Sequence, residues 1–99
     1  MVQESKTNQR IGAQLLIHGR VQGVGFRFFA QDLARQSGLS GWVRNLPDGT
    51  VEALVEGSRQ AIEDFIKKLE EGPSMGRVDD IRIQWQPAEG RASDFSITG

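Results

Sequence analysis

The sequence predicts a single α+β domain in which two helices cover one face of a mainly antiparallel sheet. Two stretches carry apolar residues at helical spacing, and each follows a stretch that alternates like a β-strand. Between them lie two further strand-like runs, GWVRNL and TVEALVE, joined by the turn sequence Pro47-Asp48-Gly49. The resulting order is β-α-β-β-α-β, which is the split βαβ arrangement of ferredoxin-like α/β sandwiches.

Residues 1–12 are polar and show no periodicity, so we expect a flexible N-terminal arm and a single domain over residues 13–99. The first strand is expected from Ala13 to Val21. The first helix follows a glycine-rich stretch and ends at Ser37-Gly38, a typical C-cap pair. Its apolar stripe consists of Phe26, Phe29, Ala30, Leu33 and Ala34.

The second half of the chain predicts two more strands and a helix. The run at 51–56 alternates valine and alanine with Glu52 and Glu56, as a half-buried strand does. Ser58 is a suitable N-cap for the second helix, which should end at Gly72-Pro73. Its apolar stripe is Ile62, Phe65, Ile66 and Leu69. The final long strand contains Ile81, Ile83 and Trp85, alternating with Arg82, Gln84 and Gln86, and Phe95 with Ile97 predicts a short edge strand.

Composition narrows the classes of function. The chain has 99 residues, 37% hydrophobic and 25% charged, with a net charge of -1, which argues against a nucleic-acid partner. It contains no cysteine and one histidine, so disulfides, thiolate chemistry and a His/Cys metal site are not expected. The sequence shows neither a membrane-spanning run nor the apolar core of a signal peptide. We therefore expect a cytoplasmic protein.

The stretch GRVQGVGFR at residues 19–27 is open to three interpretations. It is a simple connection, a dinucleotide-binding turn or a binding loop for a small anion. The dinucleotide interpretation is weak because the chain has too few βα units for a doubly wound sheet. A Walker loop does not fit, because no Lys-Ser or Lys-Thr follows the last glycine.

The charges near this loop favour the anion interpretation. The first turn of a helix carries the positive end of the macrodipole and usually contains acidic residues. Here it contains Arg27, and the nearest acid downstream is Asp32. Glycines allow successive backbone N–H groups to converge on an anion, and an arginine suits a phosphate group. Against this stands the simpler view that Arg27 extends into solvent or pairs with an acid.

Asn45 is the second notable residue. Asparagine just before a hairpin turn is most often a turn or capping residue. The alternative is an amide that orients a water molecule, since an amide both donates and accepts hydrogen bonds without titrating. His18, one residue before the glycine-rich stretch, has the opposite strand parity to Leu15 and Ile17, and we assign it a structural or surface role.

The two segments IHGRVQGVGFR (17–27) and GWVRNLPDGTVEALVEG (41–57) resemble the two signature motifs of the acylphosphatase family, without a gap. The resemblance extends from about Ala13 to Ile97. It implies a ferredoxin-like sandwich that hydrolyses acyl phosphates to a carboxylate and inorganic phosphate, with no metal or cofactor. Family members often end in an arginine and an aromatic residue, whereas this chain ends Ile97-Thr98-Gly99.

The resemblance also assigns residues. Arg27 would be the catalytic arginine that binds phosphate, and Asn45 would position the attacking water. The phosphate-binding loop would be formed by the backbone amides of Gln22, Gly23, Val24, Gly25 and Phe26, together with that of Arg27. Inorganic phosphate, as the product, is expected to inhibit competitively, and the protein is expected to be a monomer.

Two other classes of function remain open at this point. A regulatory module would bind the anion without turning it over, but the presence of both Arg27 and Asn45 argues against that role. An RNA-binding module of this fold would need aromatic and basic residues together on the open sheet face. The strands lack paired aromatic residues, and the sequence has no tyrosine.

Overall fold

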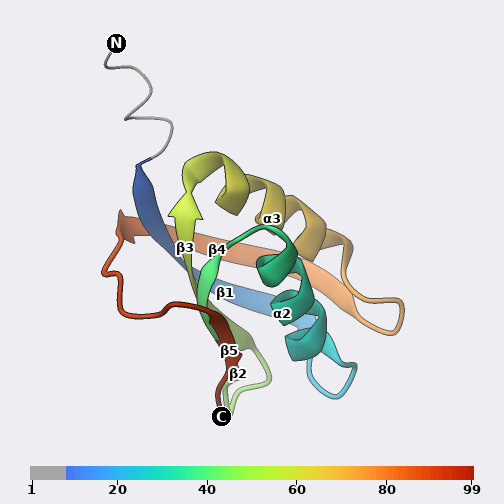
Figure 1. The fold of residues 1–99 in the computed structure, drawn as a ribbon. Coiled ribbons are helices and arrows are strands. Elements are labelled where there is room, and N and C mark those ends of the chain that lie inside the picture. Colours follow the sequence, from blue (N-terminus) through green and yellow to red (C-terminus); the bar gives the residue numbers. More distant parts are fainter. Residues whose placement is uncertain (1–8) are drawn as a thin grey trace.

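The computed structural model describes residues 9–99 and shows a five-stranded sheet with two helices packed on one face (Figure 1). The elements, in chain order, are β1 (Arg10–Arg20), α2 (Phe26–Gln36), β2 (Ser40–Asn45), β3 (Val51–Ser58), α3 (Arg59–Glu71), β4 (Arg77–Pro87) and β5 (Phe95–Ile97).

The strands are ordered β4-β1-β3-β2-β5 across the sheet. All neighbouring pairs are antiparallel except β2 and β5, which are parallel. Each helix therefore connects two parallel strands between which another strand is inserted, as the split βαβ order requires. The predicted fold class is confirmed, and so is the short strand at Phe95–Ile97.

The core lies between the sheet and the helices. Ala13, Leu15 and Ile17 of β1 are fully buried, because alternate residues of a strand face the same side. The neighbouring strand β3 buries alternate residues on the same face, namely Val51, Ala53 and Val55. Leu15 of β1 lies opposite Ala53 of β3. The helical stripes complete this layer with Phe26, Ala30, Ala34, Ile62, Phe65, Ile66 and Leu69. Each large apolar side chain buried here contributes about 1.5–3 kcal/mol.

The two helices begin differently. Ser58 is the N-cap of α3, and its hydroxyl oxygen accepts a hydrogen bond of 3.2 Å from the backbone N–H of Ala61, as its sequence position predicts. The N-cap of α2 is Gly25, which has no side chain to perform that role. The first turn of α2 also contains no acidic residue. The N-terminus of α2 therefore presents backbone N–H groups that no side chain caps.

The structure differs from the sequence-based expectation at the start of β1 and at Ile83. Strand β1 begins at Arg10 rather than Ala13, so the last part of the expected arm belongs to the sheet; residues 1–8 lie outside the described part. Ile83 is 42% exposed, although it shares a face with the buried side chains of β1, because β4 is an edge strand. No helix of residues 9–99 is long and apolar enough to cross a membrane.

Candidate active site

The loop between β1 and α2 turns on two glycines with positive φ. Gly23 has φ 74° and Gly25 has φ 77°, the left-handed region that other residues adopt only with strain. Alternation of right- and left-handed backbone makes successive N–H groups converge, which forms an anion-binding nest. The uncapped N-terminus of α2 directly follows the loop. Backbone geometry therefore makes this end of β1 a favourable place for an anion.

The third glycine of the motif has a different role. Gly19 lies within β1, where the pairing with β4 shifts register. A Cβ atom at Gly19 would collide with the carbonyl oxygen of Arg77, so only glycine permits this approach of the two strands. Gly19 thus belongs to the sheet, and the loop itself depends on Gly23 and Gly25.

The other loop residues fit around this turn. Phe26 is buried in the core, with its ring centroid 5.8 Å from that of Phe29, so it anchors the start of α2. Val24 is half-buried and packs near Gly76, in the segment before β4. A Cβ atom added at Gly76 would lie 3.1 Å from Cγ2 of Val24. The side chains of the loop therefore fix it to the domain while its backbone N–H groups stay available.

Arg27 lies in the first turn of α2 and is half-buried. Its Nη1 atom donates a hydrogen bond of 3.1 Å to the backbone oxygen of Gly99. The segment around Gly99 is itself held to β2, because the N–H of Thr98 donates to the carbonyl oxygen of Val43 at 2.9 Å. Arg27 is therefore directed along the flank of α2 toward the end of β2, where Asn45 lies.

Asn45 is the last residue of β2 and shares the helix-covered face of the sheet with Val43, two residues earlier. Its Oδ1 atom is buried and has no hydrogen-bond partner among the described residues. A buried amide oxygen without a partner costs about 1–3 kcal/mol of free energy. Such an atom is rare in a folded protein and is well suited to hold a water or a ligand.

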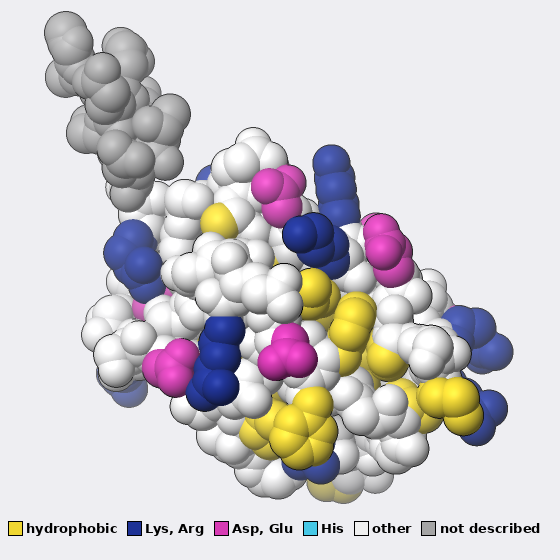
Figure 2. Space-filling view, turned by 45° about the vertical axis from the view of Figure 1, so that its right-hand side comes forward, with side chains coloured by type: hydrophobic (Ala, Val, Ile, Leu, Met, Phe, Trp, Pro, Cys, Tyr) yellow, Lys and Arg dark blue, Asp and Glu magenta, His cyan; other side chains and the backbone are white. Residues whose placement is uncertain are grey.

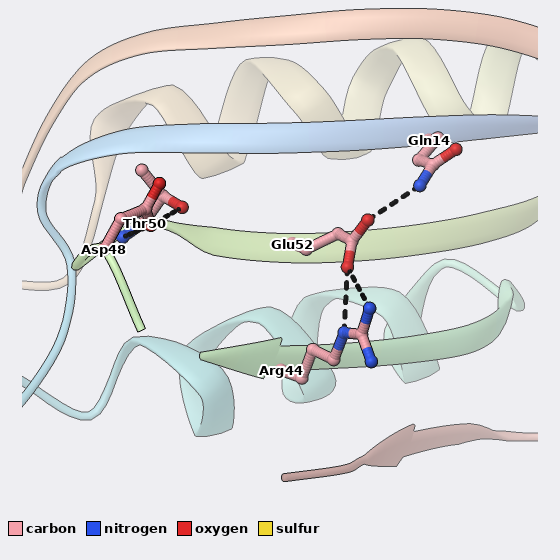
Figure 3. Close-up of polar contacts among 5 residues, drawn as sticks. All are labelled: Gln14, Arg44, Asp48, Thr50 and Glu52. Atoms are coloured by element: carbon pink, nitrogen blue, oxygen red, sulfur yellow. Dashed lines mark hydrogen bonds and ion pairs between the residues drawn. The ribbon is translucent and has the colours of Figure 1, made fainter. Parts of the chain in front are cut away.

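The hairpin that follows Asn45 is held by a carboxylate (Figure 3). Oδ1 of Asp48 accepts hydrogen bonds from the hydroxyl of Thr50 at 2.6 Å and from its backbone N–H at 3.0 Å. The hydroxyl bond, followed by the backbone bond, lowers the pKa of Asp48 below its ordinary value. The turn also contains Gly49 with φ 94°. These contacts define the chain path immediately after Asn45.

Gln22 connects the glycine loop to this hairpin. Its Nε2 atom donates to the carbonyl oxygens of Leu46 and Thr50, each at 2.8 Å. Leu46 directly follows Asn45, so the loop and the candidate water-binding residue are joined by side-chain hydrogen bonds. The structure thus brings together the two motifs that are separated in the sequence.

His18 does not lie in this site. Like Leu16, His18 points to the face of the sheet that the helices do not cover, whereas Leu15 and Ile17 are buried on the other face. Asn45 lies on the helix-covered face, so the two side chains are on opposite faces. Its Nδ1 atom is 4.0 Å from a carboxylate oxygen of Asp80, the residue it faces on β4. His18 therefore lies on the sheet face away from the candidate site, and its structural or surface role stays a prediction.

The open face of the sheet carries a polar network centred on Glu52 (Figure 3). Gln14 donates to one carboxylate oxygen at 2.7 Å, and Nε of Arg44 donates to the other at 2.8 Å. The guanidinium of Arg44 also lies 5.1 Å from the ring centre of Trp42. Arg44 on this face is thus paired with an acid, and Figure 2 shows acidic and basic side chains interspersed over another face of the molecule. Neither pattern resembles a nucleic-acid interface.

A hollow of about 840 Å³ lies at the other end of the sheet, where β1 and β2 begin. It is lined by residues that include Arg10, Ser40 and Asp94. Arg10 donates to the hydroxyl of Ser40 at 2.9 Å. Because the glycine loop follows the end of β1 and Asn45 ends β2, this hollow is separate from the candidate site. An anion nest is formed by backbone N–H groups and does not need a deep cavity.

The sequence draws attention to Arg27, Asn45 and the loop as candidates, but it does not predict three contacts of the structure. These are the side-chain bonds of Gln22, the Asp48–Thr50 interaction and the contact of Arg27 with Gly99. The first and third join residues far apart in the chain. Only the Asp48–Thr50 pair carries a local signal, because aspartate two residues before a threonine often closes a turn.

Comparison with known proteins gives a consistent result. The family model described as acylphosphatase matches residues 13–97. A curated relative, the acylphosphatase of Thermococcus kodakarensis, is 46% identical over 91 residues, which cover 92% of this chain and 99% of the relative.

Two solved structures share the fold along nearly their whole length. An acylphosphatase from Bacillus subtilis has a TM-score of 0.87 and 37% identity, covering 90% of this chain and 99% of its own. An acylphosphatase from Coxiella burnetii has a TM-score of 0.87 and 33% identity, covering 99% of this chain and 100% of its own.

Proposed function

Because the chain belongs to the acylphosphatase family and hydrolyses acyl phosphates, we propose that Arg27 and the loop amides bind the phosphoryl group while Asn45 orients the attacking water. The observation that carries this proposal is the joining of the glycine loop to the hairpin of Asn45 by Gln22. This link supports the proposal because it connects the loop that contains Gly23 and Gly25 to the hairpin after Asn45, whose Oδ1 has no hydrogen-bond partner among the described residues.

The phosphoryl group is bound by backbone and arginine together. Backbone N–H groups of residues 22–27 and the N-terminus of α2 supply fixed dipoles, and they need no rearrangement when charge develops. The guanidinium of Arg27 adds two parallel donors and a full positive charge. Its bond to the backbone oxygen of Gly99 uses Nη1, which leaves donors of Nη2 and Nε for oxygens of the phosphoryl group.

The water is held by Asn45. Its Oδ1, which has no partner among residues 9–99, accepts a hydrogen bond from the water and so directs the oxygen lone pair toward phosphorus. Since the amide does not titrate, this orientation is independent of pH. Fixing the nucleophile in line with the leaving group converts a chance encounter into a near-attack geometry.

The reaction balances without a redox partner. The water oxygen forms a bond to phosphorus while the bond between phosphorus and the carboxyl oxygen breaks, and the electron pair leaves with the carboxylate. The proton lost by water is taken up by a phosphoryl oxygen. A carboxylate is a stable leaving group, so positioning and charge stabilisation are the main requirements. The proposed site meets both with arginine and amide groups and assigns no step to a metal.

The test is steady-state hydrolysis of benzoyl phosphate in the presence of a chelator, with and without inorganic phosphate. We expect turnover that the chelator does not alter, and competitive inhibition by phosphate because it occupies the same loop. Phosphate binding without turnover would contradict the proposal and favour a binding module. A requirement for added divalent cation would contradict the metal-independent mechanism.

The proposal has two further parts. The protein acts as a monomer, because the candidate site is built from elements of one chain. It acts in the cytoplasm, in keeping with a sequence that contains no cysteine. Analytical ultracentrifugation under turnover conditions tests the monomeric state. Fractionation of the source cells tests the location.

A further inference from the structure

We propose that the side chain of Gln22 is a positioning residue that sets the geometry between the bound phosphoryl group and the water held by Asn45. This inference rests on the proposed function and adds a role that the backbone N–H of Gln22 does not provide. The side chain joins the two halves of the site but touches neither reactant.

The bonding of the Gln22 amide supports this role. A primary amide has two N–H donors, and Nε2 donates to two acceptors, the carbonyl oxygens of Leu46 and Thr50, at 2.8 Å each. Both donors are therefore used on the hairpin, and neither remains for a phosphate oxygen. Gln22 thus acts on the reaction only through the positions of other groups.

The two acceptors lie on either side of the hairpin turn. Leu46 follows Asn45 directly, and Thr50 precedes Val51, the residue that Asn45 faces on β3. The chain on both sides of the Asn45–Val51 pair is therefore held by one side chain from the glycine loop. A shift of the loop relative to the hairpin would require breaking both bonds.

Such a link matters because no regular secondary structure joins the glycine loop to the hairpin. Residues 21–25 belong to no helix or strand, and two of them are glycines. A misplacement of about 1 Å between reacting groups can reduce a rate about 100-fold. Gln22 limits this displacement without contributing a charge.

The alternative is that Gln22 only stabilises the fold, and the hydrogen bonds of the hairpin argue against it. Without Gln22, the carbonyl oxygen of Thr50 still accepts from the N–H of Leu46 at 2.9 Å. The carbonyl oxygen of Leu46 still accepts from the N–H of Gly49 at 3.2 Å. Neither acceptor becomes unpaired, so the cost to folding should be small.

The chain offers a matched control. Gln31 of α2 also donates through Nε2 to a distant carbonyl oxygen, that of Phe95, at 3.1 Å. This bond joins α2 to β5 and does not link the loop to the hairpin. Gln22→Met and Gln31→Met each replace an amide with a side chain of similar length that cannot donate.

We would measure kcat and KM for benzoyl phosphate, the inhibition constant of inorganic phosphate, and the urea midpoint for both variants. Gln22→Met should lower kcat at least tenfold, while the phosphate inhibition constant changes less than about twofold, because Arg27 and the loop amides remain. Gln31→Met should retain the kcat of the unsubstituted protein. A Gln22→Met protein with normal kcat, or with phosphate affinity lost in the same proportion as kcat, would overturn the inference.

A second variant provides a pH signature. At neutral pH, the carboxylate of Gln22→Glu has no proton to donate to the carbonyl oxygens. As the pH falls toward about 4.3, the protonated acid regains one donor. The kcat of Gln22→Glu relative to Gln22→Met should therefore rise at low pH, and a constant ratio would overturn the inference. If the unsubstituted protein failed to turn over, the proposed function would be wrong. Normal turnover in that protein and in Gln22→Met would refute only the role of Gln22.

Discussion

Arg27 and Arg35 both extend from α2 to the C-terminal segment, but only Arg35 meets a side-chain carboxylate there. Nη2 of Arg35 lies 3.0 Å from Oδ2 of Asp94, whereas Nη1 of Arg27 donates to the backbone oxygen of Gly99. No ion pair between Arg27 and a side-chain carboxylate occurs within residues 9–99. Of these two arginines, Arg27 is therefore the one whose charge is neutralised by no acidic side chain of residues 9–99.

Replacement of Gly25 by alanine should impair both folding and phosphate binding. Its φ of 77° strains any other residue, and alanine there should cost about 1–2 kcal/mol. An added Cβ would meet no atom within 4 Å, so the strain is purely conformational. Relaxation of the strain would turn the loop N–H groups away from the anion. Urea unfolding and phosphate inhibition constants measure the two effects.

Gly38 provides the control for that substitution. Gly38 has a φ of 71°, and a Cβ atom added there would also meet no atom within 4 Å. It follows the end of α2, whereas Gly25 precedes the start of that helix. Gly38→Ala should therefore lose a similar amount of stability and bind phosphate normally. Equal loss of phosphate affinity in both variants would mean that Gly25 acts through general stability alone.

The carboxylate of Asp48 should stabilise the fold above about pH 4 and cease to do so in stronger acid. Hydrogen bonds from Thr50 lower the pKa of Asp48 in the folded protein below its ordinary value of 3.8. A lowered pKa means that the unfolded chain binds the proton more readily, so the stabilisation is lost as pH falls through the folded pKa. The urea midpoint of Asp48→Asn should lie below that of the unsubstituted protein at pH 6 and approach it below pH 3.8.

Comparing Asp48→Asn with the unsubstituted protein removes the contributions of the other acidic residues to the pH dependence of stability. The pKa of Asp79 is lowered chiefly by its hydrogen bond with Arg77, and that of Asp94 chiefly by the backbone N–H of Phe95. Both titrate in the two proteins alike. A difference between the midpoints that stays constant from pH 6 to pH 2.5 would show that Asp48 contributes through the turn conformation rather than through its charge.

Ser58→Ala should destabilise the protein without changing its kinetics. The substitution removes the only side-chain acceptor of the N–H of Ala61 in the described structure, and an N-cap of this kind contributes about 1 kcal/mol. For a domain of this size, the thermal midpoint should fall by about 4–8 °C. Calorimetry measures the shift. A changed kcat at a temperature where the variant is fully folded would contradict the separation of α3 from the site.

Much of the fold follows from local pattern. The stripe from Ile62 to Leu69 repeats at helical spacing, and Ser58 precedes it as a cap, so propensity and burial agree there. The same holds for Leu15 and Ile17, which alternate as a half-buried strand does. These elements were predictable because the residues that define them are near neighbours in the chain.

Other features depend on pairing across the fold. Strand β1 extends back to Arg10 because Arg10 faces Ser58 on β3, although nothing in the residues before Ala13 alternates like a strand. Glu56 was expected to face solvent but is 2% exposed. Its carboxylate accepts the backbone N–H groups of Glu89 at 2.7 Å and Gly90 at 2.9 Å, where the chain after β4 folds over it.

In the candidate site, too, some features are visible in the local sequence and others depend on contacts across the fold. Arg27 was noticeable because it occupies a helix turn that usually contains acids, and the resemblance of the two motifs drew attention to Asn45. The bonds from Gln22 to the hairpin could not be predicted, since they depend on how the end of β1 meets the end of β2 in space.

The central claim is that Arg27 binds the phosphoryl group and Asn45 acts only on the water. The most direct measurement compares kcat and the inhibition constant of inorganic phosphate for Arg27→Ala and Asn45→Ala, with Arg35→Ala and Arg44→Ala as controls. Arg27→Ala should lose phosphate binding and at least about 100-fold in kcat/KM, whereas Asn45→Ala should lose kcat to a similar extent and keep phosphate binding. The two controls should match the unsubstituted protein. Normal turnover in either Arg27→Ala or Asn45→Ala, or loss of phosphate binding in both, would contradict the account.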